Sequence, residues 1–172
     1  DSKVKYYALT LIANCGSNEM CNSCVSEILK LSQSTNPGIL KRVAMVVTRI
    51  VSKFPEYTES FVPVAKKLMQ NATHGVVAAS INLMTAIMHS SPQNEGAFNS
   101  YMGAFVKVLK QLHQAKATKE FGFSIHNDPF LQIRILKIIS ELKVPSDDLD
   151  EILESLITQC ELKRNSSRSL LY

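Results

Sequence analysis

The sequence predicts an all-α fold, an α-solenoid in which antiparallel helical hairpins stack side by side. Apolar residues recur at helical spacing in run after run, and turn-forming residues separate the runs. Similar breaks return roughly every 38 residues, from Pro37 to Gly75 and from Pro55 to Pro92, which is the length of a two-helix repeat. No run has the alternation of a strand. The pattern is therefore that of a HEAT- or armadillo-like helical array.

Length and composition agree with this fold class. The chain has 172 residues, of which 45% are hydrophobic and 20% are charged, as in an ordinary globular protein. No apolar run approaches the roughly 20 residues that a membrane-spanning helix needs. The chain opens at Asp1 without an initiator methionine or a secretion signal. We expect residues 1–172 to be one helical-repeat piece, cut at both ends from a longer cytosolic protein.

The turn residues divide the chain into eight helices and the start of a ninth. The predicted helices cover residues 4–15, 19–31, 37–54, 57–69, 75–90, 96–115, 129–142 and 146–164, and the ninth begins within 167–172.

Each of the first five helices lies between such turns and has one apolar stripe. The third starts at Pro37, which presets the backbone of a first helical turn. Its apolar face carries Ile39, Val43, Val46, Val47, Ile50 and Phe54. Lys41, Arg42 and Lys53 lie away from that face, so the solvent side of the helix is basic. The fourth helix contains Pro63, which a helix tolerates only near its first turn or with a kink.

The sixth helix precedes the longest polar gap of the chain, residues 116–127. A connection of this length in a compact solenoid is mobile, is shaped by a partner, or packs back on the scaffold. The gap is the best candidate for a functional loop. Its apolar residues Phe121, Phe123 and Ile125 favour packing, and Phe121 and Phe123 become partner contacts if the loop binds.

The seventh helix has the firmest start. Asp128 is a capping residue, and Pro129 suits the first helical position. Apolar residues follow on one stripe and on other faces as well, including Phe130, so we expect this helix to be packed on nearly every side. The eighth helix opens with acidic residues at the positive end of its dipole, which indicates helix chemistry and not a metal site.

The cysteines and histidines give weak signals for catalysis or metal binding. Cys21 and Cys24 have the spacing of half a zinc site or a redox pair, but no second pair follows at finger spacing. We interpret both as compact apolar residues in a helix. No glycine-rich phosphate loop occurs, and a histidine held beside a thiol is an arrangement that sequence spacing alone does not reveal. The sequence predicts no enzyme, no cofactor and no metal.

Four segments together carry a family resemblance. They are the run 128–136, the segment 73–77, Leu40-Lys41-Arg42 followed by Ala44, and the segment 17–21. These segments resemble the amino-terminal trunk of adaptins, the large subunits of clathrin adaptor complexes. The chain looks most like the gamma type of the trans-Golgi network and endosomes. The alpha and epsilon types typically have Pro-Ala-Pro-Trp where this chain has Asn127-Asp128-Pro129-Phe130. Segments 124–127 and 141–145 depart from the family pattern.

The resemblance implies a scaffold without enzymatic activity, acting in vesicle-mediated protein transport and cargo sorting. Such a trunk cradles a sigma-type small subunit, pairs with a beta-type large subunit, and works beside the medium subunit. The full-length complex engages an Arf-type GTPase and phosphoinositide head groups. It implies a cytoplasmic protein that is peripheral on membranes of the trans-Golgi network, endosomes and clathrin-coated vesicles.

Partner contacts are expected at Lys41, Arg42, Lys53, Phe121 and Phe123. The alternative is another helical-repeat scaffold, such as a nuclear-transport or nucleic-acid solenoid that holds an acidic ligand on a basic edge. That edge would consist of Lys41, Arg42, Lys53, Lys66, Lys67, Lys107, Lys110 and Lys137. These cations are scattered across helices without aromatic residues between them, which favours a solvated face. No nucleic-acid partner is expected.

Overall fold

The computed structural model describes residues 2–90, 92–94, 96–115, 122–123, 126–142 and 144–159. They fall into two compact units, Asp1–Gly96 and Ala97–Tyr172. None of the described helices has the length and apolarity that a membrane crossing requires.

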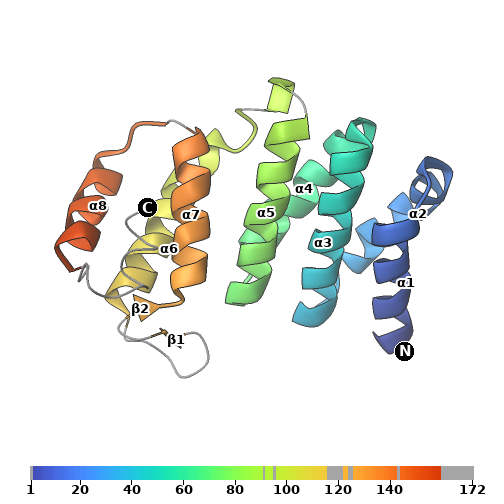
Figure 1. The fold of residues 1–172 in the computed structure, drawn as a ribbon, viewed down its shortest axis with the longest axis horizontal. Coiled ribbons are helices and arrows are strands. Elements are labelled where there is room, and N and C mark those ends of the chain that lie inside the picture. The colour runs from blue at the N-terminus through green and yellow to red at the C-terminus, as the bar shows by residue number, and fades with distance from the viewer. Residues whose placement is uncertain are drawn as a thin grey trace. The chain divides into compact units, whose positions relative to one another are not determined.

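Both units are helical, which confirms the predicted fold class (Figure 1). The first unit contains α1 (Ser2–Cys15), α2 (Asn18–Leu31), α3 (Pro37–Lys53), η1 (Pro55–Tyr57), α4 (Thr58–Met69), α5 (His74–Ser90) and η2 (Pro92–Asn94). The second contains η3 (Asn99–Tyr101), α6 (Met102–Gln114), β1 (Gly122–Phe123), β2 (His126–Asn127), α7 (Pro129–Leu142) and α8 (Asp147–Gln159).

Helix α3 is the centre of the first unit. It packs against α1 on one side and α5 on the other, while α2 and α4 lie behind this row (Figure 1). Val43, Val47 and Val51 of α3 are completely buried, as is Phe61 of α4. Five of the six residues of the predicted α3 stripe are buried, whereas Phe54 lies just beyond the end of the helix and is half-buried. Val51 was not in the predicted stripe.

Polar contacts between helices follow the same repeat. The Asn18 side-chain amide donates to Glu56 Oε1 over 3.0 Å, and the Tyr57 hydroxyl donates to Asn18 Oδ1 over 2.6 Å. The side-chain hydroxyls of Thr58 and Ser90 are hydrogen-bonded to each other at 3.0 Å, and the Lys67 ammonium donates a hydrogen bond to Gln33 Oε1. Each bond joins residues 32 to 39 positions apart. This agrees with the repeat length inferred from the turn residues.

In the second unit, α6 contacts both α7 and α8. Phe105 and Leu109 of α6 are completely buried, as are Ile135 and Ile138 of α7. On the α8 side, His113 and Ser155 are hydrogen-bonded at 2.9 Å. Lys110 and Glu151 form an ion pair at 3.7 Å. Two polar contacts one helical turn apart therefore fix α8 on α6.

The sixth helix begins later than predicted. Residues 96–98 form a turn, η3 follows, and α6 starts only at Met102. Asn99 and Ser100 side chains compete with the backbone for hydrogen bonds and weaken a helix start there. The completely buried Phe98 holds the turn against the core instead. The predicted helix 96–115 included Phe98, but α6 does not extend to it.

A short antiparallel pair of strands contradicts the expectation that the chain has no strand. Gly122 pairs with Asn127, and Phe123 pairs with His126.

The proline at position 129 disfavours the right-handed helical region for the residue before it. Asp128 has φ 44°, a left-handed conformation, so the chain turns sharply between strand and helix.

Helix α7 is less enclosed than predicted. Its stripe of Leu131, Ile135 and Ile138 is buried, but Phe130 is 69% exposed. Arg134 and Lys137 are also exposed, so α7 packs through one stripe and has a solvent face. The apolar residues outside the stripe were wrongly expected to be covered.

Pro63 lies in the second turn of α4, inside the helix. Its ring nitrogen has no hydrogen to donate, so the Glu59 carbonyl has no helical partner. Glu59 is exposed, and water can take that place. The predicted end of the eighth helix near 164 and the ninth helix lie outside the described residues.

Asp128 provides the first test of this fold. Its Oδ1 accepts from the Leu131 amide at 3.1 Å and caps α7, and the residue is mostly buried. Asp128→Ala should lower the free energy of unfolding by about 1–2 kcal/mol through loss of the cap. Alanine at this left-handed position should also cost about 1 kcal/mol of backbone strain. Asp128→Gly also loses the cap but accepts the backbone conformation, so it should be the milder variant in denaturant unfolding. Equal losses would contradict the role of the backbone.

His113 provides a second test. Burial lowers the pKa of its imidazole below the usual 6.5, so the folded chain binds its proton less readily than the unfolded chain. The free energy of unfolding should therefore fall as the pH decreases through 6.5 towards the folded pKa. His113→Gln should flatten this slope in unfolding measured over pH. The same change at the exposed His89 is the control.

Candidate functional site

The surface of α3 carries three of the predicted partner contacts. The exposed residues of this helix recur at helical spacing on the side opposite its buried valines. This α3 face consists of Lys41, Arg42, Met45, Arg49, Ser52 and Lys53, all of them exposed. Lys41 and Arg42 are adjacent, whereas Lys53 lies about 18 Å further along the helix. The structure therefore brings the three predicted cations onto one basic face, with Lys53 apart from the other two.

Arg42 also has a structural contact. Its guanidinium lies 5.3 Å from the centre of the Tyr6 ring, and Nη1 donates to Thr10 Oγ1 over 2.7 Å. A Cβ at Gly38 would lie 2.5 Å from the Tyr6 hydroxyl oxygen, so a larger residue there would displace the end of the Tyr6 side chain. Arg42 therefore clamps α1 onto α3. Helical spacing placed Arg42 on the surface, but it could not show this contact.

Lys41 lies at the other border of α3. A Cβ at Gly75 would come within 3.1 Å of Lys41 Cδ, so the lysine stem passes over the start of α5. Its aliphatic part covers backbone while its ammonium stays in water, as is common for lysine. Lys41 and Arg42 thus connect α3 to its two neighbours.

Met45 occupies the middle of the α3 face. Its side chain is 64% exposed, although Val43, Ala44, Val46 and Val47 around it in sequence are buried. Sequence reasoning did not single out Met45. The only signal was its position at helical spacing from Lys41 and Arg49.

The two loop phenylalanines remain predictions. Phe121 lies outside the described residues. Phe123 belongs to β1, but its side chain is not among the described parts.

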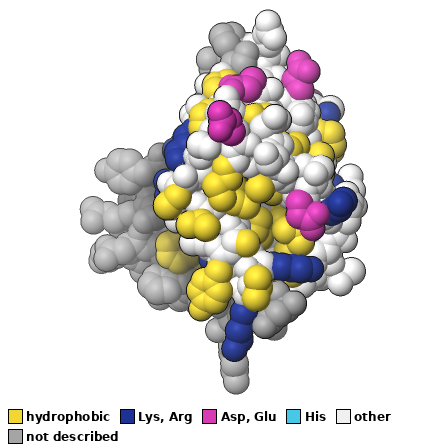
Figure 2. Space-filling view, turned by 90° about the vertical axis from the view of Figure 1, so that its right-hand side faces the viewer, with side chains coloured by type: hydrophobic (Ala, Val, Ile, Leu, Met, Phe, Trp, Pro, Cys, Tyr) yellow, Lys and Arg dark blue, Asp and Glu magenta, His cyan; other side chains and the backbone are white. Residues whose placement is uncertain are grey.

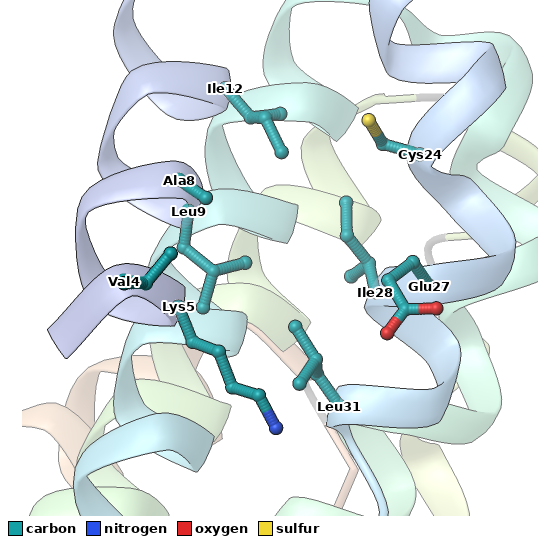
Figure 3. Close-up of a pocket in the computed structure, with 9 residues that line it drawn as sticks. All are labelled: Val4, Lys5, Ala8, Leu9, Ile12, Cys24, Glu27, Ile28 and Leu31. Carbon is teal, nitrogen blue, oxygen red and sulfur yellow. The ribbon is translucent and has the colours of Figure 1, made fainter. Parts of the chain in front are cut away.

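A second candidate surface is an apolar groove between α1 and α2, with a volume of about 270 Å³ (Figure 3). Lys5 and Glu27 approach it from opposite walls. Its other lining residues are Val4, Ala8, Leu9, Ile12, Cys24, Ile28 and Leu31. Beside it, Val4, Tyr7 and Leu11 are more than half exposed, and Figure 2 shows apolar side chains gathered on this end of α1 and α2. Such a surface suits the apolar side of a helix and offers little to orient a polar substrate.

The cysteines of α1 and α2 are free thiols. Cys21 is buried, and burial, followed by the neighbouring Cys24, raises the pKa of its thiol. A raised pKa disfavours the reactive thiolate, which suits a packing role. Within the described ranges, no cluster of three or more histidine, cysteine or acidic side chains could hold a metal ion. Cys160 lies outside those ranges.

Comparison with known proteins gives one consistent result. The sequence matches the family described as "Adaptin N terminal region" over residues 1–172. It is 27% identical to human "AP-1 complex subunit gamma-like 2" over 98% of this chain and 22% of that protein. It is 30% identical to "AP-1 complex subunit gamma-1" of Mycosarcoma maydis and 29% identical to "AP-1 complex subunit gamma-2" of Arabidopsis thaliana. Each of these matches covers 96% of this chain, and 19% and 20% of the respective relatives. The chain thus spans about a fifth of the length of these relatives.

The clamp between Arg42 and Tyr6 can be tested by a double-mutant cycle. Arg42→Ala and Tyr6→Leu should each destabilise the protein, and their effects should be coupled by about 0.5–1 kcal/mol through the cation–π contact. Denaturant unfolding of the two single variants and the double variant measures the coupling. Strictly additive losses would show that the two side chains contribute independently.

Proposed function

The chain belongs to the family of adaptin N-terminal regions, and from this membership we propose that it is a scaffold segment of a gamma-type large subunit of a clathrin adaptor. The observation that carries the proposal is the family match along the entire chain. The run from Asp128 into α7 and the turn before α5, which first suggested the resemblance, begin helices in the structure.

In this role the chain binds other proteins and performs no catalysis. Stacked helical pairs present long surfaces on which many weak contacts add. The α3 face and the groove between α1 and α2 are two such surfaces. The lining of the groove is mostly apolar, which suits a protein contact and offers little to orient a polar substrate.

The proposed partners are those of the adaptor complex. They are a sigma-type small subunit and a beta-type large subunit, with the medium subunit in the same assembly. An Arf-type GTPase and phosphoinositide head groups are engaged through the full-length complex. The proposed location is the cytoplasm, peripheral on membranes of the trans-Golgi network, endosomes and clathrin-coated vesicles, and the proposed process is cargo sorting in vesicle-mediated transport.

The structure gives a physical argument against the nucleic-acid alternative. Of the eight cations in the supposed basic edge, Arg42 is bonded to Thr10, Lys67 to Gln33, and Lys110 to Glu151. These three side chains already have partners within the chain. A phosphate-binding edge needs several cations directed at the backbone of one ligand.

Co-purification tests the proposed function. The natural full-length protein, co-expressed with a sigma-type and a beta-type adaptor subunit, should elute with both from a size-exclusion column. Elution as a partner-free species from that mixture would count against the proposal. Binding to duplex DNA, measured in parallel at rising salt, tests the alternative, because phosphate-driven binding falls steeply with ionic strength.

A further inference from the structure

The charges of the first unit are separated between its two rows of helices. Helices α1, α3 and α5, which form the row at the front of Figure 1, contain no aspartate or glutamate. The acidic residues in the other described helices of this unit are Glu19 and Glu27 in α2, Glu56 in η1, and Glu59 in α4. Asp1 and Glu95 are outside the described residues. The surface of the α1–α3–α5 row therefore carries cations without acids among them.

The α3 face lies in the middle of this row. Lys41 and Arg49 lie one helical turn before and after the exposed Met45, and Lys53 lies at the end of the helix. On the next helix of the row, α5, the exposed positions are Asn82 and His89, so no acid neutralises the cations from that side. On α1, the cations are Lys3 and Lys5. Their summed field attracts a negatively charged surface.

We propose that the α3 face docks an acidic surface of a folded protein partner, with Met45 as the apolar centre of the contact. The inference rests on the proposed function, because it names the chemistry of the partner that the scaffold takes. Methionine and arginine are enriched in the cores of protein–protein interfaces, whereas lysine belongs to their rims. Met45 and Arg49 occupy the centre of the face, and Lys41 and Lys53 lie towards its ends.

The composition of the face favours a protein over a phosphate ligand. A nucleic acid or a lipid head group gains its affinity from phosphate charge and gives no reason for an exposed methionine among the cations. The Arg42 guanidinium lies over one face of the Tyr6 ring, so that face is not available for stacking with a base. A protein surface supplies carboxylates for the cations and an apolar side chain for Met45.

Two variants test the two parts of the contact. Arg49→Glu reverses one central charge, and Met45→Ser removes the apolar centre while leaving every charge in place. Both residues are exposed, so the melting temperature should match that of the wild type. Lys107→Glu on α6 is the matched control, because it makes the same change of charge at another exposed position.

Binding of the full-length protein to purified sigma-type and beta-type subunits gives the readout. Arg49→Glu and Met45→Ser should each raise the Kd for one of these partners on the order of tenfold. Lys107→Glu should leave the Kd unchanged. For the wild type, the Kd should rise with ionic strength, and this dependence should be weaker in Arg49→Glu.

Three other results of this binding experiment would overturn the inference, and they differ in what they imply for the proposed function. Partners that bind both variants as tightly as the wild type would place the contact elsewhere and leave the proposed function standing. Absence of binding by the wild type would remove the proposed function itself. A third outcome is that Arg49→Glu weakens binding to phosphoinositide-containing vesicles or to duplex DNA while Met45→Ser has no effect on any partner. It would assign the face to a phosphate ligand.

Discussion

The burial of α3 is the constraint on which the rest of the first unit depends. A helix whose valines are completely buried cannot be stable alone in water, because its apolar stripe needs neighbours to exclude solvent. Helices α1 and α5 cover its flanks, and α2 and α4 cover its back. One side of α3 therefore remains free for polar residues, and this side is the basic face.

Much of this architecture could be predicted from the sequence. Capping and turn residues such as Asn36 before Pro37 and Asp128 before Pro129 mark helix starts through local bonds, and the structure contains those bonds. Helical periodicity likewise indicated the buried residues of α3 and α7. These signals act within a few positions of the chain. They therefore do not require knowledge of which helices become neighbours.

The errors and omissions arose where distant segments meet. The contact of Arg42 with α1 depends on Tyr6, which lies 36 positions earlier. Gly75 leaves room for the Lys41 side chain, which passes over the start of α5. Phe130 was expected to be covered because apolar residues surround it in sequence, yet no described helix packs on it. The candidate site divides in the same way. Spacing placed Lys41, Arg42 and Lys53 on one side of a helix, while the exposure of Met45 and the acid-free row became visible only with neighbouring helices in place.

The polar bonds described between helices connect residues 15 to 42 positions apart. Contacts of such short range favour rapid folding, because little chain must be ordered before each contact forms. A helical pair can therefore dock on the preceding pair soon after it leaves the ribosome, without waiting for the carboxyl-terminal end. The growing chain would expose only one incomplete edge at a time, which limits the apolar surface available for aggregation during synthesis.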